Sequence, residues 1–299
     1  MQSYWDDFWG LRGYRDAAFL ATLLDHGQAA ATLTAQADQF ERELMASLRA
    51  SGAEHKVNYL AGAAELGDFD PTSTSIALSP GGLLGRLPQE HLLATFERYW
   101  SQFAARRDGT LAWQDYTPYE LRNVAAFVRL GWRARAHELL EFFMRDRRPL
   151  AWNQWAEVVG REVRTPRFVG DMPHGWISSD FMRSALDLFA YEREADHALV
   201  LADGIPRAWL AGAGVSVSEL RTTAGKLTYV MRQEGQRVII HIASGLTLPA
   251  GGIVVRAFEG ERGQATVNGH TTPWQAGELH ITTLPATVII DYSTSKATP

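Results

Sequence analysis

The 299-residue sequence contains no cysteine. Disulfide bonds, thiolate metal sites and cysteine nucleophiles are therefore excluded, although this absence fits reducing and oxidising compartments equally well. No apolar run approaches the roughly 18 residues that a membrane-spanning helix needs. The stretch from Met1 to Trp9 is polar and aromatic, unlike the basic start and apolar centre of a signal peptide. We expect nothing in this chain to cross or target a membrane, and its compartment stays open.

Clusters of positive charge are also scarce. The formal net charge is −5, from 29 Lys and Arg residues against 34 Asp and Glu residues, and the longest basic stretch, Arg145 to Arg148, is interrupted by Asp146. A nucleic-acid partner is not expected, because phosphate backbones are bound by basic patches. With 46% hydrophobic and 21% charged residues, the composition predicts a folded protein. The length predicts one large domain and a small one.

Apolar residues recur at helical spacing through the first two thirds of the chain. The pattern predicts seven helices, at residues 15–26, 32–51, 72–79, 88–106, 117–130, 133–146 and 177–192. Their connections alternate between short ones, such as 27–31 and 131–133, and long ones at 52–71, 107–116 and 147–176. Such alternation is typical of helical hairpins with one plain end and one elaborated end.

After Gly204 the pattern changes to short β-branched runs with alternating polarity, separated by turns such as Asn268-Gly269. We expect seven or eight strands in an antiparallel β-sandwich. The predicted domains are a helical domain at residues 1–203 and a β-sandwich at 204–299.

Acidic and aromatic residues occur together in three segments, at 4–9, 65–70 and 152–157, the last continuing to 171–176. All three fall in predicted loops. Glycosidic bond hydrolysis uses one carboxylic acid as proton donor and one carboxylate as base or nucleophile, with aromatic faces that hold the sugar. Each segment also has a purely structural interpretation, because Asp caps helices, Trp fills cores and His174 could be a core histidine. No Gly-x-Ser-x-Gly motif, phosphate loop or i, i+4 histidine pair is present, so no cofactor or metal ion is expected.

Two motifs suggest a family. The sequences Tyr-Trp-Asp-Asp-Phe-Trp-Gly-Leu-Arg-Gly at 4–13 and Gly-Asp-Met-Pro-His-Gly-Trp-Ile at 170–177 resemble bacterial members of the six-hairpin glycosidase superfamily. The passage 152–257 resembles the end of α-L-rhamnosidases. In glucoamylase-like members, the general acid precedes the sixth barrel helix and the base precedes the twelfth. The resemblance implies that this chain is the C-terminal part of an (α/α)6 toroid, with about seven of its twelve helices, and that full-length relatives are exported.

The resemblance also implies roles for individual residues. Asp7 or Asp6 would be the proton donor and Glu157 the base of an inverting glycoside hydrolase acting on an oligo- or polysaccharide. An N-terminal half or a second chain would complete the barrel. The residues expected to contact sugar are Trp5, Trp9, Arg12, Asp68, Asp70, Trp152, Trp155, Asp171, His174 and Trp176.

Two other classes of function remain open. A non-catalytic carbohydrate-binding module would keep the aromatic platforms without a correctly placed acid pair. Phosphorylases and polysaccharide lyases also occur on α/α barrels. A lyase would use Tyr116 or Tyr119 with His174, and Arg122 to neutralise a uronate.

Overall fold

The computed structural model describes residues 1–162, 171–258 and 261–293. The chain divides into two compact units, Met1–Ser184 and Ala185–Pro299. Among the described residues, no helix is both long and apolar enough to span a membrane. Gly170, the first residue of the second family motif, lies outside the described residues.

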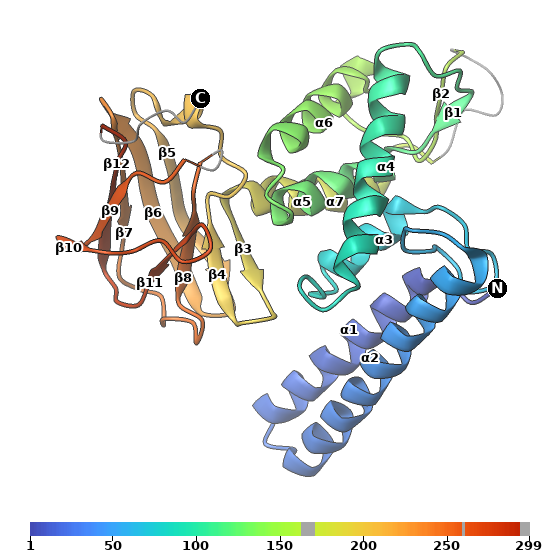
Figure 1. Ribbon diagram of the computed structural model, residues 1–299, viewed down its shortest axis with the longest axis horizontal. Coiled ribbons are helices and arrows are strands. Elements are labelled where there is room, and N and C mark those ends of the chain that lie inside the picture. Colours follow the sequence, from blue (N-terminus) through green and yellow to red (C-terminus); the bar gives the residue numbers. More distant parts are fainter. Residues whose placement is uncertain (163–170, 259–260, 294–299) are drawn as a thin grey trace. The chain divides into compact units, whose positions relative to one another are not determined.

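The first unit is helical, and the prediction of seven helices followed by strands is confirmed (Figure 1). The described helices form no closed barrel or toroid. Short 3-10 helices also occur at Pro118–Leu121 (η1) and Leu150–Trp152 (η2). The α-helices are α1 (Tyr4–Leu23), α2 (Gly27–His55), α3 (Pro71–Leu78), α4 (Gln89–Arg107), α5 (Arg122–Arg129), α6 (Arg133–Arg145) and α7 (Gly175–Phe189).

Helix α1 begins about eleven residues earlier than the sequence pattern predicts, at Tyr4. The first acidic and aromatic segment therefore lies in a helix, and its placement in a loop was wrong. Tyr4, Phe8 and Leu11 are buried and follow the i, i+4, i+7 spacing of one helix face. Gly10 lets α2 approach closely, because a Cβ there would lie 3.1 Å from the Phe40 ring. Figure 1 shows α1 and α2 side by side as a hairpin.

The second acidic segment belongs to the connection between α2 and α3. The Asp70 carboxylate caps α3 by accepting hydrogen bonds from the backbone N–H groups of Thr72 and Ser73, both at 3.0 Å. The Asp68 carboxylate accepts a hydrogen bond from the backbone N–H of Ala63 at 2.9 Å. Both carboxylates thus order this connection, in agreement with the structural interpretation of the segment.

Helices α4, α5 and α6 form the core of the first unit. Phe96, Phe103, Phe127 and Phe143 are fully buried and their neighbours include further aromatic rings. A short ladder lies beside this core, where β1 (Asp115–Tyr116) pairs with β2 (Val159–Gly160). This ladder holds the connections 107–116 and 147–176 next to each other, although the paired residues are about forty positions apart in the sequence.

The second unit contains two sheets whose buried faces are rich in Val, Ile and Leu. A six-stranded antiparallel sheet has the order β10-β9-β12-β7-β6-β5, and a four-stranded sheet has the order β11-β8-β4-β3. The strands are β3 (Ala190–Arg193), β4 (Ala198–Leu201), β5 (Val215–Thr222), β6 (Gly225–Glu234), β7 (Arg237–Ile242), β8 (Ile253–Arg256), β9 (Gln264–Val267), β10 (His270–Thr271), β11 (Glu278–Ile281) and β12 (Ala286–Asp291). A 3-10 helix, η4, lies at Arg207–Leu210.

Two features of this unit differ from the sequence prediction. Strand β4 pairs with β8 in parallel, so the smaller sheet is mixed and the expectation of a purely antiparallel sandwich was wrong. Strands β3 and β4 also precede Gly204, and β3 starts directly after α7, where the helical pattern continues to residue 192. All four residues of β4 are buried, so this strand lacks the alternation that identifies a half-exposed strand.

Candidate functional site

The β1–β2 ladder brings the Trp-Ala-Glu segment to the start of η1. Beside the ladder, the Thr117 hydroxyl donates a hydrogen bond to the backbone carbonyl of Glu157 at 2.8 Å. The backbone N–H of Glu157 donates to the carbonyl of Asp171 at 3.2 Å, and the N–H of His174 donates to the carbonyl of Trp155 at 3.3 Å. These bonds hold Glu157, Asp171 and His174 together at the N-terminus of α7.

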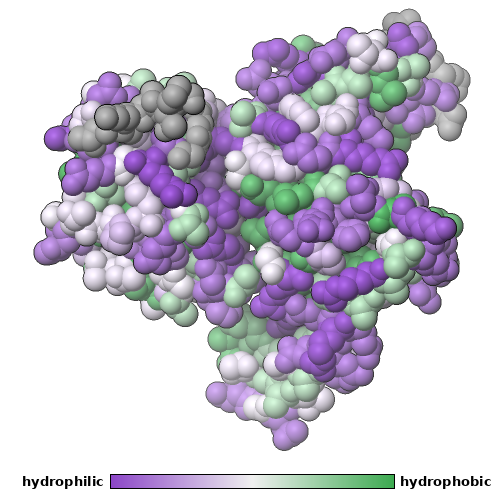
Figure 2. All heavy atoms as spheres, in the orientation of Figure 1, coloured by the Kyte–Doolittle hydropathy of each residue, from purple (hydrophilic) through white to green (hydrophobic). Residues whose placement is uncertain are grey.

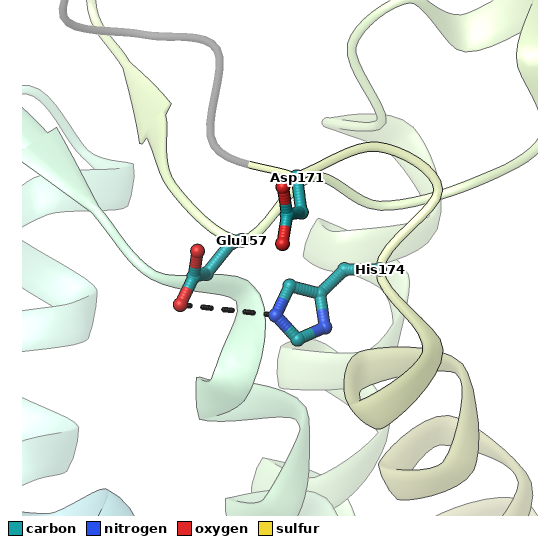
Figure 3. Close-up of side chains that lie close together, drawn as sticks. All are labelled: Glu157, Asp171 and His174. Carbon is teal, nitrogen blue, oxygen red and sulfur yellow. Dashed lines mark ion pairs between the residues drawn. The ribbon is translucent and has the colours of Figure 1, made fainter.

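The side chains of these three residues face one another (Figure 3). One ligand-type atom from each lies within 4.8 Å of those of the other two. The His174 Nε2 atom is 3.7 Å from Glu157 Oε1 and 3.2 Å from the Tyr119 hydroxyl. The His174 side chain is 13% exposed and that of Glu157 is 42% exposed, whereas Asp171 lies at the surface. The sequence did not predict that these three residues form a possible metal-binding cluster, because their spacing matches no i, i+4 ligand motif.

A row of aromatic rings runs from α1 to this cluster. The ring centroids of Trp9 and Trp5 are 6.1 Å apart, and those of Trp5 and Trp176 are 5.9 Å apart. Trp176 is in turn 6.2 Å from Tyr119 and 6.5 Å from His174. We call Trp9, Trp5, Trp176 and Tyr119 the aromatic row. It connects the first turn of α1 with the first turn of α7, and both Trp9 and Trp176 are exposed.

The paired acidic residues occupy the first turn of α1, beside the aromatic row. Asp6 is exposed and Asp7 is half-buried. Burial raises the pKa of the Asp7 carboxyl above its ordinary value, and the negative charge of Asp6 raises it further. The geometry thus distinguishes two residues between which the sequence could not choose.

Other predicted site residues lie elsewhere or are committed to structural contacts. Trp155 is buried; its indole N–H donates to the Phe143 carbonyl at 2.9 Å and its ring contacts Phe181. The Arg12 guanidinium pairs with Asp16 and donates to the Pro80 carbonyl. Trp152 is exposed in η2, while Asp68 and Asp70 order the connection before α3.

A buried carboxylate that the sequence did not single out holds Arg122, which packs against Tyr119 of the site. Asp180, on α7, accepts hydrogen bonds from Arg122 at 2.5 Å and from Arg183 at 2.8 Å. The Arg122 guanidinium lies 4.1 Å from the centre of the Tyr119 ring. Within an amphipathic helix, an Asp looks like a surface residue, so only its burial reveals this role. Tyr116 is buried, and its hydroxyl donates a hydrogen bond to the Asp146 carboxylate.

Comparison with solved structures shows distant structural similarity. No protein-family model and no curated protein matches the chain. A solved structure of an α-L-rhamnosidase from Dictyoglumus thermophilum is similar, with 10% sequence identity and a TM-score of 0.42. The similarity covers 95% of this chain and 31% of that one, so the chain spans about a third of the rhamnosidase's length. At this level of similarity, the residues of the site must carry the functional conclusion.

Proposed function

We propose that this chain carries the catalytic residues of an inverting glycoside hydrolase that acts on an oligo- or polysaccharide. Asp7 protonates the leaving glycosidic oxygen, and Glu157 activates the attacking water. The exposed faces of Trp9 and Trp176 hold the sugar rings, and Asp171 and His174 supply polar contacts. The barrel that this family resemblance implies is completed by further helices in cis or by a second chain.

The aromatic row is the observation that carries this proposal. It joins the helix turn that contains Asp7 to the cluster that contains Glu157, through ring-centroid separations of 5.9 to 6.5 Å. Exposed aromatic faces flanked by carboxylates suit sugar rings, which present apolar faces and polar edges. The raised pKa of Asp7 also suits a residue that must keep its proton until the glycosidic oxygen needs it.

A lyase is the second candidate, because Tyr119, His174 and Arg122 are in contact. Three observations favour hydrolysis. Burial raises the pKa of the Tyr119 hydroxyl, the Arg122 charge opposes this only in part and the Glu157 charge adds to it, so Tyr119 is a poor base at neutral pH. Arg122 is bound to buried Asp180. The carboxylates of Glu157 and Asp171 would repel a uronate.

The proposal is tested by assaying the chain, alone and in any longer form that contains it, on a panel of aryl glycosides and oligosaccharides. We expect hydrolysis that Glu157→Gln and Asp7→Asn each reduce by about 10²-fold or more. The anomer released first, followed by NMR, distinguishes inversion from retention. Wild-type turnover in both variants would exclude these roles. Binding without cleavage would support a binding module, phosphate-dependent cleavage a phosphorylase, and an unsaturated product a lyase.

A further inference from the structure

We propose that Glu157, Asp171 and His174 form a binding site for a divalent transition-metal cation, with Zn²⁺ as its best-suited occupant. The three residues offer one imidazole nitrogen and two carboxylate oxygens, which all lie within 4.8 Å of one another. Imidazole nitrogen and carboxylate oxygen both ligate zinc, and three protein ligands leave a fourth tetrahedral position open to water or a ligand. Imidazole favours transition metals, whereas Ca²⁺ and Mg²⁺ prefer sites made only of oxygen atoms.

The backbone around the cluster holds the ligands in place. Glu157 and Asp171 are joined by a main-chain hydrogen bond, and His174 is joined to Trp155 by another. Zinc binds oxygen and nitrogen ligands at about 2.0–2.2 Å, so the ligand atoms must draw together slightly. The side chains of Glu157 and Asp171 have room to do this because both are at least partly exposed. His174 is the more buried ligand and presents Nε2 toward Glu157 (Figure 3).

The local charge also favours a cation. The carboxylates of Glu157 and Asp171 and the His174 imidazole approach one another within 4.8 Å, and the neighbouring Arg122 guanidinium is bound to the Asp180 carboxylate. A divalent ion would relieve the repulsion between the two carboxylates. The Tyr119 hydroxyl, which is 3.2 Å from Nε2, would give up this position and lie next to the ion.

If Glu157 is the catalytic base, an ion on its carboxylate would withdraw the electron pair that activates water. Zn²⁺ would then inhibit hydrolysis reversibly, and a chelator would restore it. This inhibition rests on the proposed function, whereas the cation site itself does not.

The test is a calorimetric titration of chelator-treated protein with ZnCl₂, CaCl₂ and MgCl₂. We expect Zn²⁺ to bind with a stoichiometry of one and Ca²⁺ and Mg²⁺ to bind far more weakly. Asp171→Asn and His174→Ala should each weaken Zn²⁺ binding by at least about tenfold. The matched control is His280→Ala, because His280 Nε2 lies 3.8 Å from a Glu278 oxygen and no third ligand joins this pair among the described residues. This control should bind Zn²⁺ like the wild type.

Asp171→Asn keeps the test valid if His174→Ala fails to fold, since Asp171 is at the surface. Co²⁺ provides a second readout, because its visible absorption reports ligand number and should change in Asp171→Asn. The site is refuted if no stoichiometric binding occurs, or if both variants bind Zn²⁺ as tightly as the wild type. Stoichiometric Zn²⁺ binding by a protein that cleaves no glycan would contradict the proposed function and support the cation site. Glycan hydrolysis without Zn²⁺ binding would support the proposed function and refute the cation site.

Discussion

Asp7 combines partial burial with a negatively charged neighbour, and both raise the pKa of its carboxyl. The positive end of the α1 dipole opposes this shift, because Asp7 lies in the first helical turn. Burial and the Asp6 charge both act in the upward direction. A carboxyl held in this way retains its proton to higher pH than an ordinary aspartic acid.

The proposed roles predict a specific pH dependence. The rate of hydrolysis should fall on the alkaline side as Asp7 loses its proton. Asp6→Asn removes the negative charge that helps to raise the pKa of Asp7, so the alkaline limb should move to lower pH while activity remains. Asp7→Asn should instead lower kcat/KM by about 10²- to 10⁴-fold. The measurement is kcat/KM against pH for the three proteins. If Asp6→Asn abolishes activity and Asp7→Asn does not, the two roles are exchanged.

Asp7→Asn should lower activity but raise the free energy of unfolding at neutral pH. A carboxyl whose pKa is raised by folding is favourable while protonated, and the folded state loses stability as pH rises above the ordinary value of 3.8. Asp7→Asn removes this loss, so the variant should be more stable than the wild type at neutral pH and should lose this advantage in acid. Thermal unfolding at several pH values measures the difference. Equal or lower stability of Asp7→Asn at neutral pH would show that the carboxylate is not disfavoured by its surroundings.

Trp155 and Trp152 offer a matched pair of aromatic residues with opposite burial. Trp155 is 5% exposed, and Trp155→Ala should lower the free energy of unfolding by about 3–5 kcal/mol. Trp152 is 62% exposed, and Trp152→Ala should change it by no more than about 0.5 kcal/mol. Urea unfolding measures both. A large cost for Trp152→Ala would show that its ring packs against protein that covers it.

At the scale of elements, the Arg122–Asp180 pair ties the start of α5 to α7. The two side chains are 9% and 3% exposed, so the pair is removed from water. Burial raises the pKa of Asp180 even though Arg122 and Arg183 oppose the shift. The desolvation of the carboxylate is therefore large, and the arginines only partly offset it.

Breaking this pair should be costly. Asp180→Ala leaves the buried Arg122 guanidinium without its carboxylate partner, and we expect a loss of about 3–5 kcal/mol in the free energy of unfolding. The ring of Tyr119, which lies against Arg122, should then lose its fixed orientation toward His174. Chemical unfolding and the NMR signals of His174 test these two effects. An unchanged stability would mean that water reaches the guanidinium.

The sequence predicts some helices and strands better than others. The ends of amphipathic helices such as α4 and α6 were predicted to within about two residues, because one face of each helix is buried and its apolar residues recur at helical spacing. The start of α1 was missed because Trp, Asp and Gly residues there hide the spacing of Tyr4, Phe8 and Leu11. The pairing of β4 with β8 was missed because strand partners leave no periodic signal.

The candidate site was predictable only in part. Composition selected the acidic and aromatic segments, and the family resemblance then implied roles for Asp6 or Asp7, Glu157 and His174. Their contacts with Tyr119 depend on the β1–β2 ladder, which joins segments far apart in the chain. Burial separates Trp155 from the exposed tryptophans, and no local pattern reports it.

At the scale of the whole molecule, the first unit exposes an apolar helix face. Near the end of α1, Phe19, Leu20, Leu23 and Leu24 are 54% to 65% exposed, and their spacing puts them on adjoining turns. Figure 2 shows hydrophobic residues at the surface of the α1–α2 hairpin. Single exposed leucines are ordinary, but a group of four on one helix is a continuous apolar surface.

This face should contribute little to the folding of the first unit, because its side chains bury little area within it. The double variant Leu20→Glu/Leu23→Glu should therefore change the free energy of unfolding by no more than about 0.5 kcal/mol for each site. Phe8→Ala, on the buried face of the same helix, should cost about 3–5 kcal/mol. Urea unfolding of the three proteins at low concentration separates the two faces. If the double variant is as unstable as Phe8→Ala, the apolar face is covered in solution, and stability that depends on protein concentration would then identify a second copy of the chain as the cover.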